Sequence, residues 1–130
     1  MTNKELMKLA IKARENAYSK YSSFSVGAAL LTKSGKVFIG CNVENAAFSP
    51  TCCAERTAFF SAIAAGERDF SAIAVCGGNV GESRIKCMPC GVCRQVMSEF
   101  CNEDFKIIIE DGEALSELTL GELLPFSFNL

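Results

Sequence analysis

The sequence predicts an α/β fold: a single three-layer α/β/α domain over residues 1–130, with a mixed sheet of about five strands. Length and composition favour one domain, because 130 residues, 49% of them apolar, can fill one core but would divide into two poor ones. Helical and strand patterns alternate in the order α, β, β, α, β, α, β, β, α. The strand–helix–strand unit over 70–110 requires a parallel pair beside antiparallel hairpins, so the sheet is mixed.

The first predicted element is a helix over about residues 3–18. Thr2 and Glu5 have the spacing of a capping box, in which each side chain bonds the backbone N–H of the other residue. Behind them apolar residues recur at helical spacing: Leu6, Leu9, Ala10, Ala13 and Ala17. A small apolar run at 25–31 and the stretch 37–43 then flank a turn, which predicts a hairpin.

A second helix is predicted at 53–65, after a polar loop at 44–52. The stretch is rich in alanine, and the glycine that follows it, Gly66, is typical of a helix C-cap. Residues 70–76 are mostly apolar, as expected for a central strand that is buried on both faces. A loop at 77–88 follows.

The last third of the chain predicts a helix, a hairpin and a short final helix. Pro89 is typical of a first helical turn, where its missing N–H costs nothing. The apolar residues behind it mark a buried helix face: Val92, Val96, Met97 and Phe100. Residues 105–110 and 114–118 flank an Asp-Gly turn and predict an antiparallel pair. A second capping-box pattern at 119–122 begins a helix that stops at Pro125.

Charge and hydropathy exclude several classes of partner. The net charge is −2, from 13 basic and 15 acidic residues, and no basic block occurs, which argues against nucleic acid as the main partner. No apolar run approaches the ~18–20 residues of a membrane span. Residues 1–10 are amphipathic and lack the apolar core of a signal peptide. We therefore expect a cytoplasmic protein without a nucleic-acid or membrane partner.

The cysteine and histidine content narrows the chemistry. The chain has eight cysteines and no histidine. In a reducing cytoplasm that many cysteines indicate metal binding or catalysis rather than a disulfide framework. Without histidine, a transition-metal site must use sulfur and carboxylate ligands, and no Ser-His or Cys-His nucleophilic pair can form.

Two cysteine motifs stand at predicted helix starts: Cys53-Ala-Glu55 and Pro89-Cys90-Gly-Val-Cys93. The partial positive charge and free N–H groups of a helix N-terminus favour the thiolate that binds metal. Cys90 and Cys93 share a first turn, and Cys53 adds a third sulfur. Three ligands with an open fourth position are typical of catalytic zinc. Near that position, Glu55 would act as a general base.

The remaining cysteines leave alternatives open. Cys87 extends the second motif to Cys87-x-x-Cys90-x-x-Cys93, which is similar to the opening of an iron–sulfur run, although the usual close of that run is absent. An iron–sulfur cluster or a closed structural zinc site therefore stays an alternative. Cys52 is ambiguous because it adjoins Cys53. Three more cysteines are expected to be packing residues: Cys41, Cys76 and Cys101.

These motifs resemble the zinc deaminase signature, in the form with cysteine in place of histidine. The resemblance covers nearly the whole chain and is to the small, homotetrameric bacterial type of cytidine deaminase. The residues that carry it are Phe24, 42–46, 53–58, 89–95 and 122–125. Phe48 departs from the pattern, because it stands where relatives commonly have tyrosine.

The resemblance implies zinc-dependent hydrolytic deamination of cytidine and deoxycytidine to uridine and deoxyuridine plus ammonia, for pyrimidine salvage. One Zn²⁺ per chain, held by Cys53, Cys90 and Cys93, would carry a hydroxide that attacks C4 of the pyrimidine. Glu55 would take the proton of the water, protonate N3 and help to pass a proton to the departing ammonia.

The resemblance also implies the contacts with the substrate. Asn42 and Glu44 would bind the ribose 3′-hydroxyl, the Ala54 N–H would bind the pyrimidine carbonyl, and Phe24 would pack against the nucleoside. An acid and an amide suit a hydroxyl group, because one accepts and the other donates or accepts. In a homotetramer with shared active sites, Phe128 would close the nucleoside pocket of a neighbouring subunit.

The net charge expected for zinc with three thiolates makes a further residue a candidate for charge compensation. Zinc with three thiolates sums to −1, whereas a His-Cys-Cys site sums to zero, so a nearby positive charge is expected to compensate. Arg56 is the best placed, just behind Cys53, and Arg94 is the next candidate.

Three other functions stay open beside cytidine deamination. A blasticidin-type deaminase shares both cysteine motifs and the size of this chain. A polynucleotide editor is disfavoured by the net charge. A zinc or iron–sulfur module without enzymatic activity belongs to a different class altogether.

Overall fold

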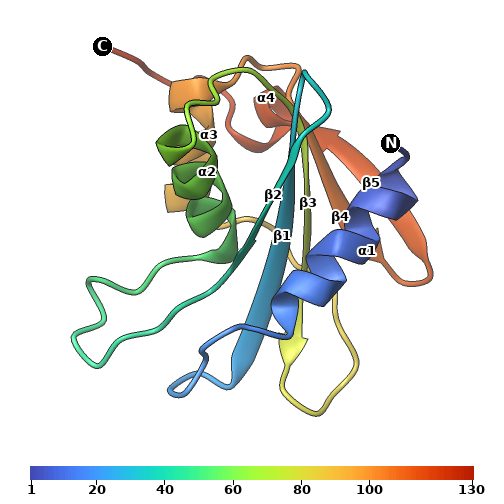
Figure 1. Ribbon diagram of the computed structural model, residues 1–130, viewed down its shortest axis with the longest axis vertical. Helices are drawn as coiled ribbons and strands as arrows, with labels where there is room; N and C mark the ends of the chain where they lie inside the picture. The colour runs from blue at the N-terminus through green and yellow to red at the C-terminus, as the bar shows by residue number, and fades with distance from the viewer.

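A computed structural model describes residues 1–130 as a five-stranded sheet with helices on both faces (Figure 1). The helices are α1 (Asn3–Arg14), α2 (Ala54–Ala64), α3 (Gly91–Phe100) and α4 (Leu120–Leu123). The strands are β1 (Phe24–Thr32), β2 (Val37–Cys41), β3 (Phe70–Asn79), β4 (Lys106–Asp111) and β5 (Ala114–Thr119). The order of elements is the predicted one, and the mixed α/β architecture is confirmed.

The strands lie in the order β2-β1-β3-β4-β5. The pair β3–β4 is parallel, with Ile73 opposite Ile107, and the other three pairs are antiparallel. The parallel pair is the one joined through α3. Parallel neighbours need a connection long enough to return the chain to the end of the sheet at which the first strand began, and a helix provides that length. β1 therefore lies between β2 and β3, and both of its edges are paired.

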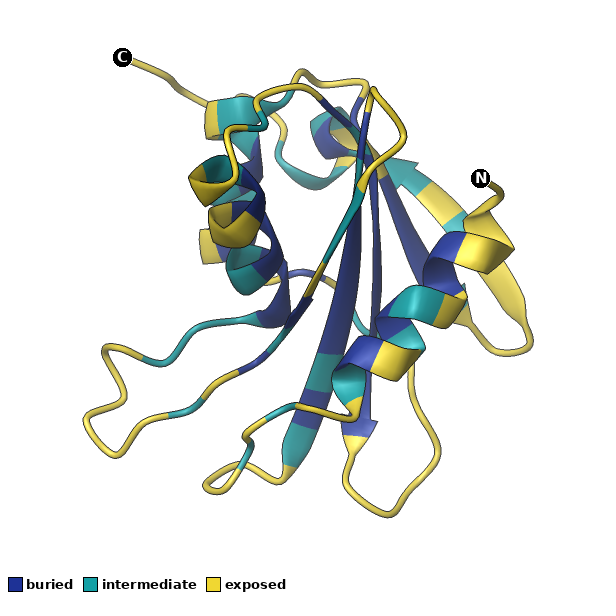
Figure 2. Ribbon diagram, in the orientation of Figure 1, coloured by how far each residue is buried: buried dark blue, intermediate teal, exposed yellow.

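Buried side chains alternate between two cores, one on each face of the sheet. On β4, Ile107 and Ile109 belong to the core beneath α2 and α3, whereas Ile108 between them belongs to the core beneath α1. Figure 2 shows that the central strands are buried along most of their length. The sheet is thus the middle layer of three, with α1 on one face and α2 and α3 on the other.

Two glycines let the helices lie close against this sheet. A Cβ atom at Gly27 of β1 would lie 2.0 Å from the carbonyl oxygen of Ala10 in α1. A Cβ atom at Gly40 of β2 would lie 2.3 Å from the carbonyl oxygen of Ala54 in the first turn of α2. Both distances are shorter than any real carbon–oxygen contact, so a larger residue would push the helix away. Gly40 therefore sets the position of the N-terminus of α2.

The first helix ends at Arg14, earlier than the predicted end at about residue 18. The residues beyond it pair with the segment that follows β2. The Tyr18 N–H donates to the Asn42 carbonyl at 2.9 Å, and the Tyr18 carbonyl accepts the Glu44 N–H at 2.9 Å. These long-range bonds compete with the helix and draw the chain out of it.

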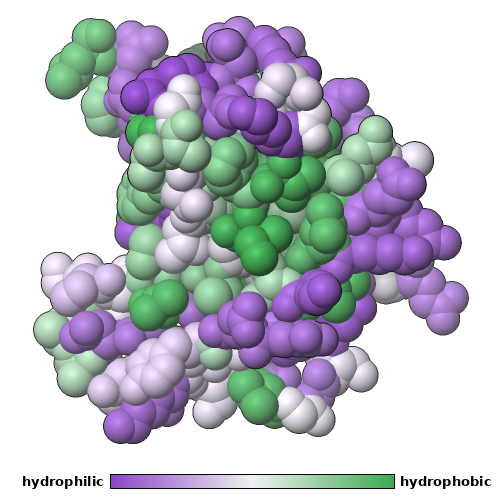
Figure 3. All heavy atoms as spheres, in the orientation of Figure 1, coloured by the Kyte–Doolittle hydropathy of each residue, from purple (hydrophilic) through white to green (hydrophobic).

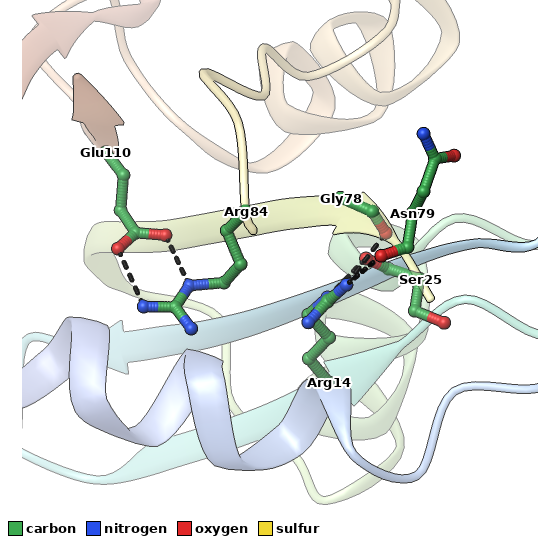
Figure 4. Close-up of polar contacts among 6 residues, drawn as sticks. All are labelled: Arg14, Ser25, Gly78, Asn79, Arg84 and Glu110. Atoms are coloured by element: carbon green, nitrogen blue, oxygen red, sulfur yellow. Dashed lines mark hydrogen bonds and ion pairs between the residues drawn. The ribbon is translucent and has the colours of Figure 1, made fainter. Parts of the chain in front are cut away.

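The third strand runs to Asn79, beyond the predicted end at residue 76, because β1 pairs with it as far as Phe24. Arg14 caps this end of the two strands. Its Nε donates to the Ser25 carbonyl at 2.7 Å and its Nη2 to the Gly78 carbonyl at 2.8 Å (Figure 4). One guanidinium thereby satisfies carbonyl groups on both strands. No helix of the protein has the length and apolar character needed to cross a bilayer.

Candidate active site

The two cysteine motifs lie at the N-termini of α2 and α3, as predicted. Cys53 is the N-cap of α2 and Cys90 is the N-cap of α3, and both have extended backbone conformations. The Cys90 sulfur accepts the backbone N–H of Cys93 at 3.4 Å, in the way that an N-cap side chain usually does. The unpaired N–H groups of two helices therefore converge on one region.

Three sulfur atoms meet in that region. The Cys53 and Cys90 Sγ atoms are 3.8 Å apart, the Cys90 and Cys93 Sγ atoms are 3.5 Å apart, and all three lie within 4.8 Å of one another. Tetrahedral zinc with Zn–S bonds of about 2.3 Å separates its sulfur ligands by roughly 3.8 Å. The donor set therefore fits zinc, and three protein ligands leave a fourth position open. Cys52 and Cys87 are outside this group.

Hydrogen bonds favour the thiolate form of Cys53. Arg56 Nη2 donates to the Cys53 sulfur at 3.2 Å. Interactions with Cys93 and Arg56 lower the pKa of Cys53 to about 5 against the opposing effect of burial. The neighbouring Cys53 sulfur and burial raise the pKa of Cys93. The sulfurs thus form one hydrogen-bonded cluster with a cation against it.

The two arginines that were candidates for charge compensation lie in different places. Arg56 contacts the Cys53 sulfur, and its Nε is buried without a hydrogen-bond partner. Arg94 donates instead to the carbonyls of Pro89 and Leu123, each at 2.8 Å. Arg94 therefore ties α3 to α4, whereas Arg56 lies against the sulfur cluster.

Glu55 lies in the first turn of α2 and is only 4% exposed. Burial raises the pKa of its carboxyl to about 7, and the negative charge of Cys53 adds to the rise. No lysine or arginine forms an ion pair with it. Buried carboxyl groups are rare without a partner, and one beside a metal-type cluster is typical of a functional group.

Two predicted substrate residues are engaged with the protein itself. The side chain of Asn42 donates to the Phe24 carbonyl at 2.8 Å and accepts the Val26 N–H at 2.9 Å. The carboxylate of Glu44 accepts the backbone N–H groups of Tyr21 at 2.9 Å and Ser22 at 3.0 Å. Both side chains thereby hold the start of β1 and the turn that precedes it.

The structure adds Ser22, which no sequence motif indicated. Its hydroxyl donates to Oε2 of Glu44 and accepts the Phe24 N–H at 3.0 Å. The bond from the Ser22 hydroxyl to Glu44, together with those from the backbone N–H groups of Ser22 and Tyr21, lowers the pKa of Glu44. The only local signal was that Ser22 stands in a polar stretch before a strand, which is common in turns and points to no particular partner.

Phe24 is half-buried, and its ring lies over Gly77 of β3. A Cβ atom at Gly77 would lie 3.0 Å from Cε1 of this ring and 2.8 Å from the sulfur of Cys87. Cys87 and Phe24 therefore both lie against Gly77. Cys52 pairs through its backbone with Val43, at 2.9 and 3.0 Å. Neither cysteine lies in the cluster of three sulfurs, as expected for Cys87.

Phe48 and Phe128 are both 70% exposed. Phe48 has a φ of 61° and meets the ring of Tyr21 edge to face at 6.2 Å. Phe128 belongs to the C-terminal segment, which leaves the body of the protein far from the N-terminus of α2 (Figure 1). Within one chain, Phe128 is therefore not brought to the sulfur cluster, whereas Ala54 is, as the first residue of α2.

The sequence and the fold define the class of protein. The family described as "Cytidine and deoxycytidylate deaminase zinc-binding region" matches residues 1–109. The chain belongs to this family, whose members are zinc-binding hydrolases. This confirms the family predicted from the cysteine motifs.

Individual relatives are similar over almost the full length. The cytidine deaminase of Halalkalibacterium halodurans is 49% identical over 129 residues, which cover 98% of this chain and 95% of the relative. The cytidine deaminase of Sporosarcina psychrophila is 48% identical over 119 residues, with 91% and 85% covered. The crystal structure of cytidine deaminase from Burkholderia pseudomallei superposes with a TM-score of 0.89 at 48% identity, covering 98% of this chain and 100% of the other.

Proposed function

We propose that this protein deaminates cytidine and deoxycytidine hydrolytically, giving uridine and deoxyuridine plus ammonia for pyrimidine salvage. The observation that carries the proposal is the cluster of three sulfurs within 4.8 Å at two helix N-termini, with the buried Glu55 in the first turn of the same helix as Cys53. Relatives of 48–49% identity that match nearly the whole chain are cytidine deaminases.

Cys53, Cys90 and Cys93 would hold one zinc ion per chain. When bound, zinc supplies Lewis acidity, which makes water an effective nucleophile near neutral pH. Arg56 donates to the Cys53 sulfur and would offset part of the charge of three thiolates. The expected place of action is the cytoplasm, where thiols stay reduced and available to metal.

Glu55 would move the protons of the reaction. It would accept a proton from the attacking water, deliver one to N3 of the pyrimidine and pass one to the departing ammonia. Addition of water at C4 and loss of ammonia convert the amino group to a carbonyl, so the atoms balance. The carboxyl is suited to this task by its place in the first turn of α2, shielded from bulk water.

The substrate would lie between the sulfur cluster and the start of β1. The Ala54 N–H, at the first position of α2, has no acceptor within the helix and would bind the pyrimidine carbonyl. The ring of Phe24 would pack against the nucleoside. Asn42 and Glu44 would bind the ribose 3′-hydroxyl, because each retains hydrogen-bonding capacity beyond its bonds within the protein.

We further propose a homotetramer with shared active sites, in which Phe128 closes the pocket of a neighbour. Phe126 and Phe128 are both strongly exposed beyond α4, and exposed aromatic residues are typical of interfaces. Hydrophobic side chains also gather over β2 between α1 and α2 (Figure 3). Ile39 of β2 and Phe60 of α2 are about half exposed, as a surface that pairs with another subunit would be.

One assay tests the function directly. Purified protein is analysed for zinc and then mixed with cytidine, and the loss of cytidine absorbance is followed together with release of ammonia. We expect a colourless protein with about one zinc per chain that forms uridine and ammonia in equal amounts. A coloured iron-containing protein would contradict the zinc site, and bound zinc without turnover of cytidine would contradict the activity.

A further inference from the structure

The hydroxyl of Ser22 joins two residues that are expected to contact the nucleoside. It donates to Oε2 of Glu44 and accepts the backbone N–H of Phe24 at 3.0 Å. A hydroxyl has a single proton, so the Phe24 carbonyl, at 3.4 Å from the same oxygen, is the weaker alternative acceptor. Ser22 thus couples the carboxylate of Glu44 to the first residue of β1.

The carboxylate of Glu44 is nearly saturated by these contacts. A carboxylate has about four acceptor positions, two on each oxygen. Oε1 accepts the N–H groups of Tyr21 and Ser22, and Oε2 accepts the Ser22 hydroxyl. One position remains, on Oε2, and it can accept one hydroxyl group.

The turn around Ser22 needs this support. The next residue, Ser23, has a φ of 59°, in the left-handed region that residues other than glycine seldom adopt. Its N–H donates to the Ser19 carbonyl at 2.9 Å, and its carbonyl accepts the Val80 N–H at 2.8 Å. The bonds from Ser22 and Tyr21 to Glu44 therefore help to hold an unfavourable turn directly before Phe24.

We propose that Ser22 is a positioning residue for the sugar of the nucleoside, acting through Glu44 and Phe24. It holds the carboxylate in one orientation and leaves one acceptor position on Oε2 for a single sugar hydroxyl. It also holds the backbone of Phe24, whose ring would lie against the nucleoside. This inference rests on the proposed function and adds a residue that sets how the sugar is recognised.

The test compares Ser22→Ala with Ser23→Ala, a neighbouring serine whose hydroxyl makes no hydrogen bond in the structure. Deamination of cytidine and of 3′-deoxycytidine is measured for both variants and for the unchanged protein. With Ser22→Ala we expect KM for cytidine to rise about tenfold, the scale of a lost hydrogen bond to a charged group, while kcat stays within about twofold. KM for 3′-deoxycytidine rises clearly less, because this nucleoside loses only the support of Phe24, and Ser22→Thr, which keeps the hydroxyl, restores KM for cytidine.

A second measurement does not depend on turnover. Carboxyl resonances are titrated by NMR, and Ser22→Ala raises the pKa of Glu44, whereas Ser23→Ala leaves it unchanged. Equal KM values for cytidine in Ser22→Ala and the unchanged protein, or an equal rise with both nucleosides, would overturn the proposal. If the unchanged protein does not deaminate cytidine, the proposed function fails separately. Calorimetry then measures the affinity for cytidine without turnover. Equal affinities of Ser22→Ala and the unchanged protein would overturn the role of Ser22.

Discussion

The two ends of the candidate site are built in different ways. At one end, the proposed metal end, the sulfurs and Glu55 belong to the N-termini of α2 and α3, and both helices pack on the central sheet. At the other end, the proposed sugar end, Glu44 is held mainly by hydrogen bonds to the exposed turn around Ser22. A core that is already packed positions the metal end, whereas a few polar contacts position the sugar end.

This difference predicts two kinds of mutational effect. Changes at the proposed metal end would remove a ligand or a proton carrier that nothing nearby replaces, so their effects should be large and should appear in metal content or kcat. Changes at the proposed sugar end would alter the orientation of groups expected to bind the unreacted part of the substrate, so they should appear mainly in KM.

The largest effect is expected from the three cysteines of the sulfur cluster, the proposed zinc ligands. Cys53→Ala, Cys90→Ala and Cys93→Ala should each lose zinc and all measurable activity, because two thiolates hold the ion poorly. Cys87→Ala and Cys52→Ala are the matched controls and should retain zinc, since both lie outside the cluster. Metal analysis of the purified variants distinguishes the two groups, and zinc retained in Cys93→Ala but lost in Cys87→Ala would reverse the assignment.

Glu55→Gln should keep zinc and the fold but lower kcat by at least about 10²–10⁴, the usual worth of general acid–base catalysis. The amide has nearly the same shape as the carboxyl and cannot carry a proton between the water and the base. Steady-state kinetics and metal analysis together check the prediction. Retention of more than about a tenth of the original kcat would refute the role of Glu55, since one group is expected to serve several proton transfers.

Arg56→Gln and Arg56→Ala should weaken zinc retention or activity by about tenfold, as is common for residues that contact metal ligands. The expected cause is loss of the positive charge at 3.2 Å from the Cys53 sulfur. Competition with a chelator measures zinc affinity, and the pH–rate profile reports the water that reacts. If zinc affinity and the pH–rate profile are unchanged in both variants, Arg56 does not compensate the charge of the thiolates.

Phe128→Ala should raise KM roughly tenfold, the scale of one buried phenylalanine side chain. Because Phe128 would serve a neighbouring subunit, Phe128→Ala and Glu55→Ala should complement each other. Co-refolded mixtures of the two variants should be more active than the sum of the parents, with subunit exchange confirmed by mass spectrometry. An additive mixture would mean that each chain closes its own site.

The smallest effect concerns stability at the sugar end. Hydrogen bonds from Ser22 and Tyr21 lower the pKa of Glu44 below its ordinary value in the folded protein. The folded state therefore binds this proton less readily than the unfolded state, and the stabilisation is present above the unfolded pKa and fades as pH falls through the folded pKa. Melting temperatures of the unchanged protein and Glu44→Gln should differ slightly at neutral pH and converge in acid. A constant difference across that pH range would contradict this linkage.

Local patterns were sufficient for much of the fold. The capping box at Thr2 and Glu5 forms as predicted, and so does the one that begins α4. The parallel pair of β3 and β4 was predictable because the helix between them leaves few other topologies. The predicted end of the first helix was wrong, since Tyr18 forms backbone hydrogen bonds with Asn42 and Glu44 instead of continuing the helix. These partners are too distant in sequence for a local pattern to indicate them.

The position of Cys53, Cys90 and Cys93 at helix N-termini follows from the local sequence, because capping and helix initiation depend on neighbouring residues. The meeting of these N-termini depends on long-range packing, since Cys53 and Cys90 are 37 residues apart and come together where two helices pack on one face of the sheet. The bond between Ser22 and Glu44 is likewise a product of tertiary structure. Polar contacts between distant segments have no periodicity along the chain, so they become visible only when the strands have been placed side by side.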